Sequence, residues 1–180
     1  DNLFRDVWEL TFSPSMAWQQ LSPTGTLPAP RWGASGAYDP VLDRVVMAFG
    51  SKSPTYAVTN EVWALSLGTT PSWTPIVPQG AAPAARFIAS GVYDAIRRRM
   101  LFFGGFTGTA ALGDLWELTL EGTPAWRQMS PSGTAPFARR AHAAIYRASI
   151  AGMVVFAGRG GPGDAFLNDT WALAAPAPQI

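Results

Sequence analysis

The feature that most constrains this chain is an internal repeat of 53 to 55 residues. Its clearest marker is tryptophan, because four Trp residues recur at spacings of 55, 53 and 55, and the first three are each followed ten residues later by a second Trp. The first set is Trp8, Trp63, Trp116 and Trp171, and the second set is Trp18, Trp73 and Trp126. Such a period predicts a repeat architecture, in which each unit packs against its neighbours.

Three further anchors keep the same period. An Arg is followed seven residues later by a Tyr, a Gly lies six residues before that Arg, and an apolar run closing in Phe is followed by Gly directly or one residue later. The Arg/Tyr pairs are Arg31/Tyr38, Arg86/Tyr93 and Arg139/Tyr146, the Gly residues are Gly25, Gly80 and Gly133, and the runs are 45–49, 100–103 and 153–156. Several anchors on one period indicate that the repeat sets the architecture.

Each unit predicts four short strands, named A to D in chain order, which are joined by turns or loops. Strand A is expected at 34–39, 89–94 and 142–146, strand B at 44–49, 99–103 and 153–156, strand C at 6–11, 61–66, 114–119 and 169–174, and strand D at 17–21, 72–77 and 125–129. The B runs are apolar, which is typical of a strand between two sheets. Strand C alternates, which favours a place nearer the rim. The Pro-containing link from D to the next A is expected to be a crossing loop.

The best copy of the repeat resembles a kelch motif. It combines Arg86 to Asp94, Phe103-Gly104-Gly105, Asp114-Leu115-Trp116 and Pro124-Ala125-Trp126. The long spacing is similar to that of the kelch repeats in the central domain of the galactose oxidase family, and the resemblance covers essentially the whole chain. It implies an all-β, kelch-type β-propeller built from four-stranded antiparallel blades. Departures from the motif are Phe49-Gly50-Ser51, Phe156-Ala157-Gly158 and Arg147, the last standing where other copies have Asp39 and Asp94.

The predicted strands add up to 13, or about three and a half blades of one partial propeller over 1–180. A half blade with strands C and D covers 1–30, complete blades cover 31–85 and 86–138, and an incomplete blade with strands A to C covers 139–180. The resemblance implies a ring of about six or seven blades, and a partial ring exposes sheet edges and apolar faces. The expected partner is the rest of a longer propeller, or a second copy that completes the ring. With a second copy one strand C is surplus, and an open half-ring is the third arrangement.

Composition argues against most catalytic and nucleic-acid functions. The chain has no Cys and one His, so the copper site of galactose oxidase-like enzymes cannot form and a zinc site lacks ligands; no metal or cofactor is expected. The net charge of +1, with its densest basic cluster at 97–99, predicts no nucleic-acid binding. No apolar stretch reaches the roughly 18 residues of a membrane-spanning helix. The resemblance to long kelch repeats favours a secreted or extracytoplasmic location, which no residue specifies.

The periodic arginines begin strand A and are expected near the channel mouth, on the face formed by the B–C and D–A loops. Arg31, Arg86 and Arg139 form a site for an anion or acidic peptide in one interpretation. In the other they pair with the carboxylates before the strand-C Trp residues, which are Asp6, Glu61, Asp114 and Asp169. Because both charges keep the period, structural pairing is favoured. His142 replaces Ala34 and Ala89, and the resemblance implies a structural histidine there.

Residues that break the period are the stronger functional candidates. Trp32, Phe87 and Arg140 follow the periodic arginines, and the variable B–C loops contribute Tyr56 and Arg159. Aromatic and Arg side chains on the loops of a rigid scaffold are favoured at interfaces, although ordinary variable loops explain them equally well. The candidate ligand-binding set is Arg31, Trp32, Tyr56, Arg86, Phe87, Arg139, Arg140, His142 and Arg159.

The sequence therefore predicts a non-catalytic scaffold that binds a protein or carbohydrate ligand through the B–C/D–A loop face. The alternative is a fragment or subunit of a larger propeller enzyme whose catalytic residues lie outside this chain. A purely structural role, in which the half-ring docks another chain edge to edge, is the third hypothesis.

Overall fold

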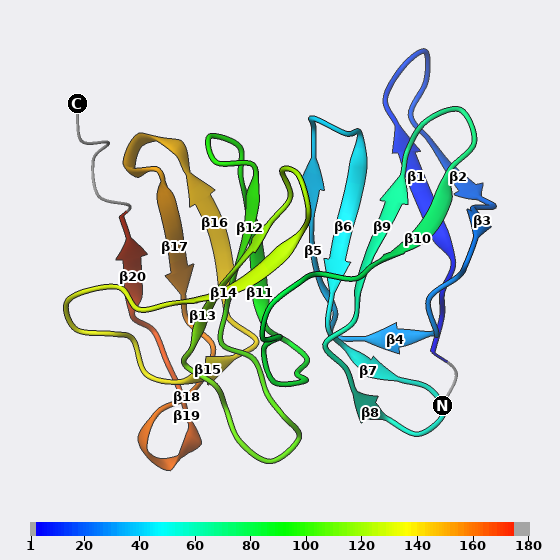
Figure 1. Ribbon diagram of the computed structural model, residues 1–180. Coiled ribbons are helices and arrows are strands. Elements are labelled where there is room, and N and C mark those ends of the chain that lie inside the picture. Colours follow the sequence, from blue (N-terminus) through cyan, green and yellow to red (C-terminus); the bar gives the residue numbers. More distant parts are fainter. Residues whose placement is uncertain (1–2, 175–180) are drawn as a thin grey trace.

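The computed structural model describes residues 3–174, which fold almost entirely into short β-strands grouped in sheets that stand side by side (Figure 1). Two single-turn 3-10 helices, η1 (Ala148–Ile150) and η2 (Pro162–Asp164), are the helical elements of that range. The predicted all-β fold of a partial kelch-type propeller is thus confirmed.

Four sheets correspond to the predicted blades, and each is antiparallel between its A to D strands. The half blade is β1 (Val7–Thr11) and β2 (Ala17–Leu21). The first blade is β5 (Ser35–Asp39), β6 (Arg44–Ala48), β9 (Val62–Ser66) and β10 (Ser72–Ile76). The second blade is β11 (Ser90–Asp94), β12 (Arg99–Phe103), β13 (Leu115–Thr119) and β14 (Ala125–Met129). The last blade is β16 (Ala143–Arg147), β17 (Gly152–Phe156) and β20 (Thr170–Leu173). The division of the chain into four residue ranges as domain parts stays a prediction.

Strand B of the first blade ends one residue earlier than predicted. The pairing of β5 with β6 aligns Ala48 with Phe103 and Phe156 of the other blades. Phe49 therefore occupies the position of Gly104, and its φ of 71° lies in the left-handed region that a strand excludes. The sequence alignment of the repeats therefore placed Phe49-Gly50-Ser51 one residue out of register with Phe103-Gly104-Gly105. In the structure Phe49 takes the place of Gly104, the first glycine of the motif.

The link between blades is more ordered than the predicted crossing loop. Residues Thr24–Gly25 form β3, which runs parallel to β10 and extends the first blade, and Gln79 bridges Ala125 in the same parallel way. The periodic glycine follows from this contact, since a Cβ on Gly25 would lie 2.3 Å from the Trp73 carbonyl oxygen. The first two links thus tether one blade to the outer strand of the next.

The hydrophobic core lies between the blades. Residues of the first blade such as Val46 and Phe49 pack on Met100 and Phe102 of the second, and Trp126 stacks on Phe49 with ring centroids 5.9 Å apart. A second cluster joins the second blade to the last. It contains Val92, Leu101, Phe103, Leu115, Met153 and Val155. The predicted Trp role in blade packing is seen at Trp73, Trp116 and Trp126, which are buried.

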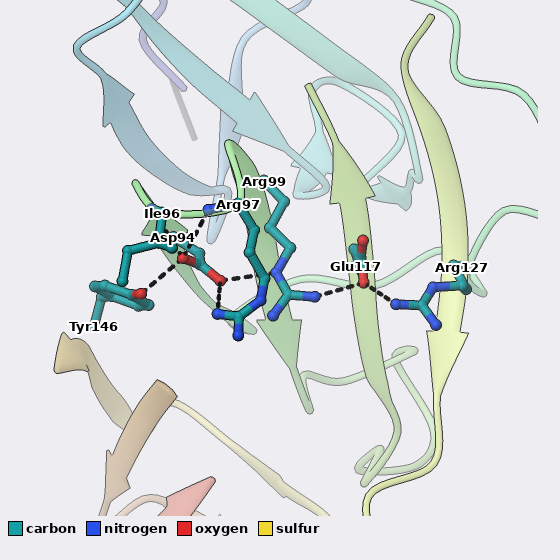
Figure 2. Close-up of polar contacts among 7 residues, drawn as sticks. All are labelled: Asp94, Ile96, Arg97, Arg99, Glu117, Arg127 and Tyr146. Atoms are coloured by element: carbon teal, nitrogen blue, oxygen red, sulfur yellow. Dashed lines mark hydrogen bonds and ion pairs between the residues drawn. The ribbon is translucent and has the colours of Figure 1, made fainter. Parts of the chain in front are cut away.

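Strand C of the second blade is buried rather than rim-like, which corrects the prediction drawn from its alternation. The residues Leu115, Trp116, Glu117 and Leu118 are all buried, because neighbouring blades cover both faces of the sheet. Glu117 is tolerated there because Arg99 and Arg127 donate to its Oε2 at 2.8 and 2.5 Å (Figure 2). A polar residue in an alternating pattern therefore marked a buried ion pair.

Candidate functional site

The B–C and D–A loops meet on one face, as predicted, and they pair there through short strands. In the first blade β4 (Arg31–Trp32) pairs with β7 (Ser51–Lys52), which pairs with β8 (Ala57–Val58). In the last blade β15 (Arg139–Arg140) pairs with β18 (Arg159–Gly160), and β18 with β19 (Ala165–Phe166). Both small sheets lie at the lower end of the blades in Figure 1. We call this surface, formed by 31–33, 51–58, 86–88, 105–112, 137–141 and 159–166, the loop face.

The periodic arginines are buried beneath the loop face. Arg86 is fully buried and binds Asp114 through both guanidinium ends, at 2.6 and 2.8 Å, while it also donates to the Gly104 carbonyl. Arg139 is fully buried as well and binds Asp169 at 2.7 and 2.8 Å. The favoured structural pairing is present, and the fold encloses both side chains, so neither is exposed on the loop face.

Arg31 makes the same type of pair nearer the surface. It donates to Glu61 at 2.8 Å, and Lys52 donates to the other oxygen at 2.7 Å. Partial burial alone would raise the pKa of Glu61, but the hydrogen bonds from Lys52, Arg31 and Trp63 outweigh it and lower that pKa to about 2. The Arg31 side chain is nearly enclosed as well, at 5% exposure.

Each strand-C Trp reinforces this arrangement, which the sequence did not reveal. The indole N–H donates to the carboxylate two residues earlier in all four copies. The pairs are Trp8 with Asp6, Trp63 with Glu61, Trp116 with Asp114 and Trp171 with Asp169. The fixed spacing of acid and Trp was the available signal. In the three blades that contain a strand A, Arg, carboxylate and Trp together hold the B–C loop against strand C.

The residues that follow the arginines come together on the loop face. Trp32 meets Phe87 edge-on at 4.7 Å between ring centroids, and Phe87 meets Phe106 at 5.7 Å. The Arg140 guanidinium lies 4.2 Å from the centre of the Phe106 ring. Trp32, Phe87, Phe106 and Arg140 thus form one continuous row across three blades, which we call the aromatic row. Phe106 is absent from the predicted set, because its packing partners Phe87 and Arg140 come from other loops.

A hollow of about 570 Å³ adjoins the aromatic row at its Arg140 end. It is lined by Phe106, Thr109, Ala111, Phe137, Ala138, Arg140, Gly160, Gly161, Pro162 and Asp164. Asp164 binds Arg140 at 2.7 Å and Arg159 at 3.1 Å, and the hydrogen bond from Arg140 lowers the pKa of the Asp164 carboxyl. Arg159 is exposed and lies over Phe166 at 5.5 Å. The hollow therefore combines an aromatic wall with charges of both signs.

Tyr56 is the last residue of the loop between β7 and β8, and its side chain is half exposed. Its carbonyl accepts a hydrogen bond from the Ser51 hydroxyl at 2.8 Å, which ties the two ends of the loop together. The structure therefore presents Tyr56 on the loop face, in the small sheet that contains Trp32.

His142 packs inside the last blade rather than on the loop face. Its ring is buried, meets Phe103 edge-on at 5.5 Å, and neither ring nitrogen has a hydrogen-bond partner within residues 3–174. Burial, assisted by the nearby Arg139 charge, lowers the pKa of His142 to about 4, so the ring is neutral near pH 7.

In the described part of the chain, no group of three or more His, Cys, Asp or Glu side chains is placed to hold a metal ion. Within residues 3–174, no helix is long and apolar enough to cross a membrane.

The stacked four-stranded sheets and the Arg–carboxylate–Trp unit define a β-propeller repeat scaffold. The chain matches the family model described as the KLHDC2/KLHL20/DRC7 Kelch-repeats domain over residues 1–177, and it belongs to that kelch-repeat family. Kelch-repeat domains generally mediate protein binding.

A solved structure titled "Structure of YjhT" has the same fold, with a TM-score of 0.68 at 15% sequence identity. The match covers 97% of this chain and 51% of that chain. The chain therefore spans about half the length of this structural relative, and the likeness concerns the fold alone.

Proposed function

We propose that this chain is a non-catalytic scaffold that binds a protein ligand through the aromatic row and its adjoining hollow. The observation that carries the proposal is the continuity of Trp32, Phe87, Phe106 and Arg140 across three blades. These residues break the repeat that the fold requires, so blade packing does not explain their identity. Their side chains nevertheless support one another as a single surface.

The physical make-up of the row suits a protein partner. Trp and Arg are enriched among residues that dominate binding energy, and such residues act best when their rotamers are held in advance. Trp32 is 44% exposed, so much of its indole remains available, while Phe87 beneath it is buried and fixes its position. Arg140 is held by Asp164 and Phe106. Little conformational entropy is therefore left to lose on binding.

The test uses peptides selected from a random display library against the purified chain, since the natural ligand is not needed to locate the face. The triple variant Trp32→Ala/Tyr56→Ala/Arg140→Ala is expected to weaken binding of the selected peptides by at least about tenfold, equivalent to about 1.4 kcal/mol. The measurement is titration calorimetry or fluorescence anisotropy.

The matched control is Val41→Ala/Leu42→Ala/Ile96→Ala, which removes three exposed apolar side chains from the A–B hairpin loops at the other end of the blades. It should leave binding unchanged. Equal losses in both triple variants, or no loss in the first, would contradict the choice of face. Circular dichroism checks that both variants keep the β-sheet spectrum.

The carbohydrate alternative uses the same face and is separated by a glycan array. Two results together would favour a carbohydrate ligand over a protein ligand. The library would yield no peptide, and the chain would bind glycans that the Trp32/Tyr56/Arg140 variant does not bind.

The alternative of a larger propeller enzyme is motivated by the coverage of 51% of the YjhT chain. It requires an ionisable cluster near the propeller axis in whatever sequence adjoins residues 1–180. Determining the complete reading frame tests it, because a frame without such a cluster contradicts an enzyme.

A further inference from the structure

The two internal blade junctions follow one packing rule. On strands A and B, side chains point alternately forward, toward the next blade, and backward, toward the preceding blade. At each internal junction the forward side chains of one blade meet the backward side chains of the next. At the first junction the forward side chains Val46 and Ala48 meet the larger Met100 and Phe102. At the second junction, larger forward residues meet smaller backward residues; the forward set is Val92, Leu101 and Phe103, and the backward set is Met153 and Val155. Large residues on one side thus compensate for small ones on the other.

An Asp and a Tyr face each other at each internal junction, and at the second junction a hydrogen bond joins them. Asp94 points forward, and the Tyr146 hydroxyl of the last blade donates to it at 2.7 Å (Figure 2). Asp39 and Tyr93 hold the same positions at the first junction, where burial and the Asp39 carboxylate raise the pKa of Tyr93 to about 12. Arg98, five residues after Tyr93, contributes a positive charge beside that hydroxyl. Each forward carboxylate thus faces a Tyr.

The forward face of the last blade is uncovered within residues 3–174. Its side chains are Ala143, Ile145, Arg147, Val154 and Phe156. Ile145 is 61% and Phe156 50% exposed, although they repeat the positions of Val92 and Phe103, which are buried at the second junction. Arg147 stands where the other blades place a carboxylate, and it contacts Ser149 of its own turn.

The backward face of the first blade is also open. The residues on this face are Gly36, Tyr38, Val45 and Met47. Val45 and Met47 repeat the positions of Met153 and Val155, and Tyr38, 49% exposed, repeats that of Tyr146. The Tyr38 hydroxyl donates to Asp43 at 2.8 Å, and Asp43 stands in the position of Arg98. The charge beside the Tyr is therefore inverted at this face.

We infer that the forward face of the last blade packs on the backward face of the first blade in a second copy of this chain. The apolar sets match by size, because Ile145, Val154 and Phe156 would meet Val45 and Met47 as Val92, Leu101 and Phe103 meet Met153 and Val155. The charges match as well. At the first junction Asp39 is forward and Arg98 backward, both beside Tyr93, and between copies Arg147 is forward and Asp43 backward.

Two such contacts join two copies into a closed, two-fold assembly. The combined length of the two copies corresponds to that of the structural relative, because one copy covers 51% of that chain. The contact involves strands A and B. Both β20 and the second copy's β1 are strands of type C, and the contact does not depend on which of the two takes that position in the joined blade. One polar contact is missing, because Ala143 lacks the hydroxyl with which Ser35 and Ser90 donate to the next blade.

Charge exchange tests the inference with substitutions that the repeat itself provides. Arg147→Asp restores the residue type of the other blades, and Asp43→Arg copies Arg98, which has the same left-handed φ. Each single variant places like charges across the contact, and each is expected to weaken self-association by at least about tenfold. The double variant Arg147→Asp/Asp43→Arg recreates the internal arrangement and should restore association.

Sedimentation equilibrium between micromolar and millimolar concentration measures this. The unsubstituted chain should reach twice its mass of 19.2 kDa. A monomer throughout the range overturns the inference, and so does a dimer that both single variants leave intact. Failure of the double variant to recover also overturns it, provided that circular dichroism shows the native β-sheet spectrum.

A cross-link decides the matter independently of the charge variants. At the first junction a Cβ on Gly91 would lie 3.4 Å from the Ser35 Cβ, close to the spacing of a disulfide. The equivalent pair between copies is Gly36 and Ala143. A Gly36→Cys chain mixed with an Ala143→Cys chain should form a mixed disulfide under mild oxidation, and the parent contributes no Cys of its own. An Ile96→Cys chain replaces Gly36→Cys as the control. Equal yields from both mixtures would overturn the inference.

Discussion

The second blade and the last blade have the same strand order but are held together by different chemistry. In the second blade Arg99 lies between Asp94 and Glu117, at 2.9 and 2.8 Å, in a buried network (Figure 2). In the last blade Arg147 stands in the position of Asp94, Gly152 in that of Arg99, and Ala172 in that of Glu117. Gly152 allows close strand packing instead, since a Cβ there would lie 1.8 Å from the Leu173 carbonyl oxygen.

The loop-face pairs do not change between these blades. Arg86 with Asp114 and Arg139 with Asp169 have nearly identical geometry. The fold therefore tolerates loss of the network inside a blade, while the Arg–carboxylate pair that anchors the B–C loop is kept. The constraint therefore lies at the loop face, where strand connections would otherwise be free.

Arg99→Ala should produce the largest effect, because it leaves Asp94 and Glu117 buried with fewer compensating charges. Breaking a buried ion pair costs about 3 to 5 kcal/mol of unfolding free energy. Urea unfolding followed by Trp fluorescence measures the change. Arg127→Ala removes the exposed partner of Glu117 and should cost less than about 1 kcal/mol. Similar losses for the two variants would refute the importance of burial.

Acidification should separate the last blade from the others, since His142 replaces Ala34 and Ala89. Burial lowers the pKa of His142 to about 4, so between that pH and about 6.5 the unfolded chain binds a proton that the folded chain excludes. Stability should fall by roughly 3 kcal/mol as the pH drops through this window. His142→Ala should flatten the pH dependence, measured by urea unfolding at stepped pH. An unchanged slope would show that carboxylates elsewhere cause it.

Removing one hydroxyl should give the smallest effect. Tyr146→Phe deletes the hydrogen bond to Asp94 across the second junction and should cost about 1 kcal/mol. Tyr38→Phe deletes a hydrogen bond to Asp43 on an exposed face and should leave the stability of the monomer unchanged. Thermal unfolding of dilute samples compares them. A larger loss for Tyr38→Phe would mean that the backward face is not open in the monomer.

Most of the fold could be predicted from the period of the sequence. Trp spacing placed the strands to within about two residues, and the pairing of Arg86 with the acid before Trp116 followed from their shared period. The errors arose where one residue type has two roles. Phe49 closes an apolar run yet lies beyond its strand, and Glu117 alternates with apolar residues yet is buried.

The candidate site was only partly predictable. Trp32, Phe87 and Arg140 stood out because they break the period, but their contact depends on Phe106 from another loop. The arginines before them were buried by the same loops that carry the row. Neighbours in sequence, such as Arg139 and Arg140, thus acquired opposite roles, one inside the blade and one on the surface.

By itself, the sequence determined the repeat, the strand types and the matching of Arg with carboxylate, because these are local or strictly periodic. Tertiary structure alone decided which polar residues are buried, which period-breaking residues meet, and which blade faces remain open. The physical reason is that burial in a propeller arises between blades about 50 residues apart in the chain, so a side chain's environment is set by the neighbouring repeat rather than by its own.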